Sequence, residues 1–175
     1  MFAKLEQFVP SAVCLSCDGC CRFKEADSRW RPKVGVEEQT ALRKIPLAQK
    51  VLTKQPLDGE GFLPTLKCHD MYLCAFFNPQ DHTCGVYQQR PFECQLYPFI
   101  ITKAPNGRPG VYVHLNCPYV QEYRLKETFA QYASYLQNYF RQQAVLDFLQ
   151  NNPSAIGDYT SYENELEYLF SIELK

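Results

Sequence analysis

The chain has 175 residues, of which 46% are hydrophobic and 21% are charged, a composition typical of a soluble globular domain. Its 18 Lys and Arg residues nearly balance its 19 Asp and Glu residues, which excludes the bulk positive charge that draws proteins to nucleic acid. No apolar stretch reaches the roughly 20 residues that cross a bilayer, and residues 1–10 lack the continuous apolar region of a secretory signal. We therefore expect one cytoplasmic domain over residues 1–175, with no nucleic-acid or membrane partner.

Regular structure is expected to be sparse in the first half of the chain. Residues 14–30 are interpreted as a cysteine-containing loop, and a short helix is predicted over 37–45, with two glutamates in its first turn. Repeated Pro and Gly residues predict irregular structure over 46–64. Over 68–94, Asn, Pro, Asp and Gly residues separate short aromatic runs, which indicates loops and turns that continue the cysteine-rich region of residues 14–118.

Regular elements are expected after this region. A strand over 99–103 and a second over 111–115 are separated by Asn-Gly and Pro-Gly turn residues, which predicts a β-hairpin. Apolar residues then recur at three- and four-residue spacing, which predicts a long amphipathic helix over 118–150 that begins at Pro118.

The C-terminal segment, residues 160–175, alternates between apolar residues and mostly Glu, which predicts a half-buried strand or tail. Thr160 and Glu163 have the spacing of a capping box and could instead begin a helix. The elements together predict a small α+β fold, with an irregular metal-binding half and a half that supplies the apolar core.

Nine cysteines are the outstanding feature of the sequence. A chain without a secretory signal keeps its thiols reduced, and an odd number leaves one thiol without a disulfide partner. Four of the nine lie within eight residues and two of these are adjacent, which ordinary disulfide geometry disfavours. The pattern therefore indicates metal ligands before disulfides.

The first four cysteines form the run Cys14-x-x-Cys17-x-x-Cys20-Cys21. Thiols that are separated by two intervening residues turn toward one centre, which is why this spacing recurs in zinc sites and in iron–sulfur sites. Three thiols at that pitch resemble a ferredoxin-type run, whose fourth ligand comes from elsewhere, whereas zinc usually takes two thiols from each of two loops. The run therefore favours an iron–sulfur cluster, of the 4Fe–4S kind, over zinc as the alternative.

The remaining cysteines lie far downstream, at Cys68, Cys74, Cys84, Cys94 and Cys117. Four of these with the first four make eight ligands, which suits two four-coordinate centres; one centre with unrelated thiols is the alternative. Cys68 is the cysteine that we expect not to be a metal ligand. A histidine lies near three of the cysteines and could complete a mixed zinc site, although each is more simply a loop residue: His69, His82 and His114.

The cysteine run followed by Cys74, by Cys84-Gly85-Val86-Tyr87-x-x-Arg90-Pro91-x-x-Cys94-x-x-Tyr97-Pro98 and by Cys117 resembles the CxxCxxCC family, also called the YkgJ family. Members of that family are regarded as candidate zinc or iron chelators. The resemblance implies metal binding through the eight cysteines other than Cys68: Cys14, Cys17, Cys20, Cys21, Cys74, Cys84, Cys94 and Cys117. It covers about residues 14–118 and supplies no reaction.

A related cysteine pattern occurs in flagellin lysine-N-methylases, which are associated with an iron–sulfur cluster. This chain has no glycine-rich methyl-donor site, nucleophile elbow or nucleotide-binding loop, so no catalytic apparatus is recognisable and an enzymatic activity stays open. Three hypotheses result. They are an iron–sulfur protein for electron transfer, metal handling or support of a modifying enzyme, a zinc-stabilised interaction module, and a cluster-dependent protein-modifying enzyme.

Four residues within the matched motif are expected to surround the ligands. Arg90 can donate hydrogen bonds to sulfur or to nearby carbonyls, because four thiolates on a metal carry net negative charge. Pro91 fixes the chain before Cys94. Tyr87 and Tyr97 are expected to pack around the site and keep water out.

Overall fold

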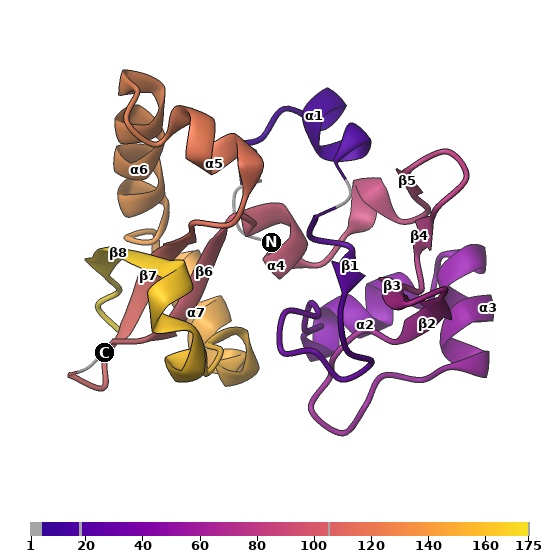
Figure 1. Cartoon of the computed structure of the whole chain (residues 1–175). Coiled ribbons are helices and arrows are strands. Elements are labelled where there is room, and N and C mark those ends of the chain that lie inside the picture. The colour runs from indigo at the N-terminus through magenta and orange to yellow at the C-terminus, as the bar shows by residue number, and fades with distance from the viewer. Residues whose placement is uncertain (1–4, 18, 105, 175) are drawn as a thin grey trace. The chain divides into compact units, whose positions relative to one another are not determined.

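The computed structural model describes residues 5–17, 19–104 and 106–174 (Figure 1). The chain divides into two compact units. The cysteine unit is Pro10–Gln95, and the terminal unit combines Met1–Val9 with Leu96–Lys175. The single domain predicted over residues 1–175 stays a prediction, because this division does not report on independent folding.

The cysteine unit has short elements in a largely irregular chain. Its helices are α1 (Ser11–Ser16), α2 (Val36–Leu42), α3 (Pro46–Lys54), the 3₁₀ helix η1 (Tyr87–Gln89) and α4 (Phe92–Leu96), which ends at the start of the terminal unit. Its strands are β1 (Arg22–Phe23), β2 (Thr65–Cys68), β3 (Met71–Cys74), β4 (Phe77–Asn78) and β5 (Thr83–Cys84). They form a three-stranded sheet of order β1-β3-β2 and a separate β4-β5 hairpin. An apolar core lies beneath them and includes Phe23, Leu42, Leu52, Leu73 and Val86.

The helix α3 corrects the prediction that residues 46–64 are irregular. Pro46 stands in the first turn of this helix, where its missing N–H is not needed and its fixed φ suits the helix. Ala48 and Leu52, four residues apart, are both buried on the same face. The chain is irregular only after Lys54. The helix predicted over 37–45 is α2, which ends three residues earlier, at Leu42.

The terminal unit is built on a three-stranded antiparallel sheet of order β6-β7-β8, with β6 at Phe99–Lys103, β7 at Pro109–His114 and β8 at Leu166–Ser171. The predicted hairpin is thus confirmed as β6 and β7. The predicted C-terminal strand is β8, preceded by the 3₁₀ helix η3 (Thr160–Glu165), so residues 160–175 contain both of the predicted conformations. The 3₁₀ turn η2 spans Pro153–Ala155.

Three helices, α5 (Pro118–Tyr123), α6 (Glu127–Tyr139) and α7 (Gln143–Asn151), replace the single long helix predicted over 118–150. The buried side chains explain the breaks. Phe129 lies nine residues after Val120, and Val145 nine after Leu136; in a straight helix such pairs point in opposite directions. Bends before α6 and before α7 let every helix bury its own apolar side, and Leu125, at the first bend, is 91% exposed.

An aromatic cluster fills the core of the terminal unit. The ring of Phe99 on β6 stacks on Phe129 and Tyr132 of α6, with centroids 5.8 and 5.2 Å away. Phe8 packs its edge against Phe99 and Phe129 from the N-terminal segment, and the Tyr135 hydroxyl accepts a hydrogen bond from the Glu6 N–H at 2.8 Å. Residues from both ends of the sequence therefore complete this core.

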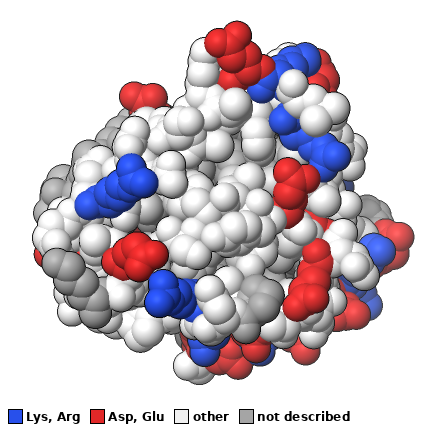
Figure 2. Space-filling view, turned by 90° about the vertical axis from the view of Figure 1, so that its left-hand side faces the viewer, with Lys and Arg blue, Asp and Glu red and all other residues white. Residues whose placement is uncertain are grey.

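With both helices and strands, the structure is α+β, as predicted. None of the described helices has the length and apolar character needed to cross a membrane. On the face shown in Figure 2, acidic and basic side chains are interspersed around an uncharged centre, so no field of one sign covers that face.

Candidate metal centre

The first cysteines are held by a helix and the loop that follows it. Cys14 lies in α1, and its N–H donates to the Pro10 carbonyl at 2.9 Å. Cys17 caps the end of this helix, and its sulfur accepts a hydrogen bond from the Gly19 N–H at 3.4 Å. Cys20 and Cys21 immediately precede β1. The run is therefore a single turn that passes from helix to strand.

The backbone brings Cys74 opposite this run. Arg22 of β1 pairs with Leu73 of β3, and the ladder continues one step further as the Cys74 N–H donates to the Cys21 carbonyl at 2.9 Å. Two thiols far apart in the sequence thus come from directly facing positions on neighbouring strands. Cys84 ends β5 opposite Phe77, and Cys94 lies in the middle of α4.

Seven thiols of the cysteine unit act on one another electrostatically. We call them the thiol set: Cys14, Cys17, Cys20, Cys21, Cys74, Cys84 and Cys94. Burial raises the pKa of Cys14 to about 11, and the Cys20 thiolate adds to the rise. Burial raises the pKa of Cys74 to about 12, with Cys84 and Cys20 contributing in the same direction. Burial likewise raises the pKa of Cys94 well above its ordinary value, and Cys74, Cys20 and Cys84 raise it further.

The two adjacent cysteines belong to the same network. The pKa of Cys20 is raised well above its ordinary value, first by a hydrogen bond with the Cys21 side chain and then by burial. That hydrogen bond lowers the pKa of Cys21, but burial and the thiolates of Cys74, Cys94 and Cys84 outweigh it and the net shift is upward. Like charges that raise each other's pKa lie close together, so the structure gathers these thiols into one region.

The thiols of the set do not converge on a single point. Among the residues that the structure describes, no three His, Cys, Asp or Glu side chains are grouped closely enough to hold one metal ion. The thiol set is therefore a neighbourhood of soft sulfur donors rather than a closed tetrahedron. Its donor chemistry, thiolate sulfur, fits zinc and iron–sulfur clusters alike.

Arg90 supplies positive charge to this region. Its guanidinium lowers the pKa of Cys14, Cys20 and Cys84, although burial outweighs it at each thiol. The guanidinium lies 4.1 Å from the centroid of the Tyr87 ring and donates to the Tyr87 carbonyl at 2.8 Å. Tyr87 in turn hydrogen-bonds to the Cys14 side chain, which lowers the pKa of that thiol. Tyr87 and Arg90 therefore lie against the thiols as a linked pair, which is more than the packing expected of Tyr87.

Pro91 immediately precedes α4 and its carbonyl accepts the Gln95 N–H at 3.0 Å, so it begins the helix that carries Cys94. Tyr97 belongs to the terminal unit, where its hydroxyl is 3.0 Å from Nδ1 of His114. The other nitrogen of His114 lies 3.3 Å from the Glu165 carboxylate. This histidine is thus engaged in a side-chain network of the terminal unit. His69 and His82 both have φ of 55°, which lies in the left-handed region that non-glycine residues adopt mainly in turns.

Two cysteines lie outside the thiol set. Cys68 ends β2 opposite Met71, beside the two-residue turn to β3, and it packs partly against the apolar core. Cys117 belongs to the terminal unit, where it is buried at the N-terminus of α5. The membership of Cys117 in the ligand set, expected from the sequence, stays a prediction.

Two acidic residues that the sequence did not mark as site residues hold α4 in place. One Glu38 oxygen accepts the Gly35 N–H at 2.8 Å, which caps α2, and the other accepts the Phe92 N–H at 2.5 Å, at the start of α4. Glu93 accepts the Lys33 N–H at 2.7 Å. The sequence offers only the two glutamates in the first turn of the predicted helix, which are favourable to that helix locally. The remote partner was not visible in it.

Gly85 has a packing reason to be glycine. A Cβ at this position would lie 2.2 Å from Cδ2 of Leu47 on α3, and its own N–H donates to the Phe76 carbonyl at 2.9 Å. The absent side chain lets α3 approach the strand that ends at Cys84. The glycine within the sequence motif Cys84-Gly85-Val86-Tyr87 therefore serves the packing of the thiol region.

Comparison with known families agrees with this chemistry. A family model described as "Putative zinc- or iron-chelating domain" matches residues 13–128. The chain belongs to this family, CxxCxxCC. The matched CxxCxxCC segment contains every member of the thiol set and Cys117 as well. Neither a curated protein nor a solved structure matches the chain.

Proposed function

We propose that this CxxCxxCC protein binds an iron–sulfur cluster, of the four-iron, four-sulfur kind, through cysteines of the thiol set. The observation that carries the proposal is the run Cys14-x-x-Cys17-x-x-Cys20, whose three thiols have ferredoxin-type spacing and act electrostatically on thiols that are remote in the sequence. A run of this kind takes its fourth ligand from elsewhere in the chain, and the thiol set supplies the remote candidates Cys74, Cys84 and Cys94.

The two kinds of centre require different distances between their ligand sulfurs. Sulfurs on one zinc lie roughly 4 Å apart, whereas those on a four-iron cluster lie on the order of 6 Å apart, given metal–sulfur bonds of about 2.3 Å. When bound, the cluster would supply one-electron chemistry, and electron transfer is accordingly the role we assign.

Residues around the thiols would tune such a centre. The raised pKa values mean that the thiols are protonated without metal, so binding must displace protons, and Arg90 supplies positive charge that offsets the resulting thiolates. Tyr87 donates a hydrogen bond toward Cys14, and hydrogen bonds to cluster sulfur shift the reduction potential.

Metal and acid-labile sulfide analysis of anaerobically purified protein tests the proposal. We expect iron and sulfide in about equal amounts, roughly four of each per chain, with a broad visible absorption that bleaches on reduction. Zinc without sulfide in a colourless protein would refute the cluster and leave a zinc-stabilised module. Cys68→Ser is the matched control, because Cys68 is a half-buried cysteine of the same unit outside the thiol set.

A further inference from the structure

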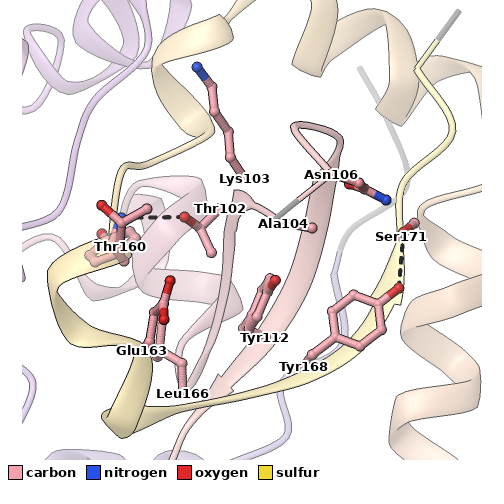
Figure 3. Close-up of a pocket in the computed structure, with 11 residues that line it drawn as sticks. Thr102, Lys103, Ala104, Asn106, Tyr112, Thr160, Glu163, Leu166, Tyr168 and Ser171 are labelled. Atoms are coloured by element: carbon pink, nitrogen blue, oxygen red, sulfur yellow. Dashed lines mark hydrogen bonds between the residues drawn. The ribbon is translucent and has the colours of Figure 1, made fainter.

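The terminal unit contains a cavity that the metal site does not use. It has a volume of about 500 Å³, within the range of small-ligand sites. It is lined by residues from the end of β6, the β6–β7 turn, β7, η3 and β8, among them Thr102, Lys103, Tyr112, Tyr159, Glu163 and Tyr168 (Figure 3). All of these residues belong to the terminal unit, so the cavity is independent of the proposed metal centre.

Two tyrosines form a corner at this cavity. Val111 pairs with Phe170 and is fully buried, whereas Tyr112 pairs with Tyr168 after a bulge and is on the opposite side of the sheet. The two rings meet at 69° with centroids 5.3 Å apart, and Tyr168 remains 50% exposed. In this T-shaped contact the edge of one ring lies against the face of the other, so π-electron density is offered by the ring faces that the contact leaves open.

The corner is held in place by its surroundings. A Cβ on Gly110 would lie 3.1 Å from the Tyr112 ring and 3.2 Å from the Tyr168 ring, so the glycine gives both rings room. The Tyr168 hydroxyl is hydrogen-bonded to Ser171 at 2.9 Å (Figure 3). The arrangement is therefore fixed by packing and by a hydrogen bond before any ligand arrives.

A carboxylate adds negative charge beside the rings. In Figure 3, Glu163 and Tyr168 lie on either side of Tyr112. Burial raises the pKa of Tyr112, and the neighbouring Tyr168 and Glu163 raise it further, which places the carboxylate within electrostatic range of the ring. Within the described part of the chain, Glu163 has no ion-pair partner. Lys103 also lines the cavity, but its side chain extends away from the two tyrosines (Figure 3).

We propose that this cavity binds an organic ammonium group, with its positive charge against Tyr112 and Tyr168 and opposite the carboxylate of Glu163. Aromatic faces attract ammonium groups through the ring quadrupole, and quaternary amines, which cannot form strong hydrogen bonds with water, gain most from such a site. The free carboxylate supplies the charge complement. A hydrocarbon ligand of the same shape would use the rings but not the charge, which gives the proposal a sharp test.

The test compares choline with its neutral isostere 3,3-dimethylbutan-1-ol, titrated into the full-length, metal-loaded protein and followed by ligand-observed NMR. We expect saturable binding of choline and at least about tenfold weaker binding of the neutral alcohol. Glu163→Gln and Tyr112→Leu should each weaken choline binding several-fold. Equal binding of the two probes, or no saturable binding of choline, would overturn the proposal.

Two control variants separate binding from folding. Glu167→Gln removes an exposed carboxylate that pairs with Arg124 at 3.0 Å, and Glu173→Gln removes one that pairs with Arg108 at 3.8 Å; neither residue lines the cavity. Neither should weaken choline binding, and all variants should keep the melting temperature of the parent except Tyr112→Leu. Unchanged choline affinity in Glu163→Gln would by itself refute the assigned role of the carboxylate.

The ammonium group could belong to a free amine or to a polypeptide side chain, and a second arm distinguishes these sources. Choline is compared with a short lysine-containing peptide and with the same peptide carrying acetyl-lysine, which has no charge. Tighter binding of the charged peptide than of choline supports a polypeptide source, and the reverse supports a free amine. Equal binding of the charged and acetylated peptides contradicts ammonium recognition in that arm.

Discussion

The cysteine unit and the terminal unit differ in the length of their strands and in the contacts that stabilise them. Strands in the cysteine unit are two to four residues long, and eight of the nine cysteines lie there. Strands in the terminal unit are five or six residues long and pack on stacked aromatic rings. Short strands contribute few hydrogen bonds, so we expect metal bonds to supply part of the stability of the cysteine unit.

Removal of the metal should produce the largest effect and should fall on one unit. We expect chelation under reducing conditions to leave the amides of β1, β3 and β5 unprotected from hydrogen exchange, because ligand binding is coupled to folding. Amides of β6 and β7 should keep their protection, because no member of the thiol set lies in the terminal unit. Mass-spectrometric hydrogen exchange measures both. Equal loss of protection in the two units would contradict the expectation that the metal stabilises the cysteine unit alone.

Substitution within the thiol set should come next. Cys20→Ser is expected to lower the metal content and to destabilise the cysteine unit by several kcal/mol, because a serine hydroxyl is a poor substitute for thiolate. Metal stoichiometry and thermal melting measure the change. Cys68→Ser is the control and should retain its metal. If Cys20→Ser keeps the parent's stoichiometry, Cys20 is not a ligand; if Cys68→Ser alone loses metal, the spare thiol is misassigned.

A core substitution in the terminal unit should have the complementary result. Leu136 on α6 is fully buried. Leu136→Ala should lower the free energy of unfolding of the terminal unit by about 2–5 kcal/mol through the lost apolar contacts and the cavity left behind. Metal bound per folded molecule should not change. Loss of metal in this variant, measured after removal of aggregated protein, would mean that the two units share their stability.

Glu38→Gln should have a smaller effect, because glutamine keeps one of the two acceptors that cap α2 and α4. We expect about 1–2 kcal/mol of destabilisation and a change in the visible spectrum of the bound centre, since α4 carries Cys94. Glu37→Gln, the exposed neighbour in the same turn, is the matched control. An unchanged spectrum in Glu38→Gln would show that the double cap does not position Cys94.

Arg90→Gln should affect the redox behaviour more than the stability. Loss of a cation beside the thiols disfavours the more negatively charged reduced cluster, so the reduction potential should fall, by tens of millivolts to order of magnitude. A potentiometric titration measures it. Arg29→Gln, an exposed arginine paired with Glu60 in the same unit, should leave the potential unchanged. A rise in the potential of Arg90→Gln would contradict the electrostatic role of Arg90.

The parts of the fold that the sequence predicted are those set by local patterns. The β6–β7 hairpin follows from alternating apolar residues around turn residues, and the end of α7 from Asn and Pro residues. The breaks between α5, α6 and α7 depend on which surface each helix covers, and no periodicity within one window reports that. Pro46 predicts a break in regular structure and equally suits the first turn of a helix, and only the burial of Ala48 and Leu52 decides between these meanings.

The candidate site likewise has a part that the local sequence predicts and a part that it does not. The spacing of Cys14 to Cys21 predicts that these thiols face one region, because it is a property of one loop. Glu38 accepts a hydrogen bond from Phe92, which lies 54 residues away in the sequence. The residues around Glu38 predict only the helix that begins beside it, and they do not identify the remote helix that it also caps. Long-range polar partners of this kind are specified by the fold and not by the local sequence.

The ladder between β1 and β3 has a consequence for how the chain tolerates insertions and deletions. Because the Cys74 N–H donates to the Cys21 carbonyl, an insertion at Gly59, in the irregular stretch between α3 and β2, can lengthen the chain at little entropic cost without altering which thiols face each other. A deletion of one residue within β3 would instead turn the Cys74 side chain to the opposite face of the sheet. The strand register, and not the length of that irregular stretch, therefore decides which thiols face each other.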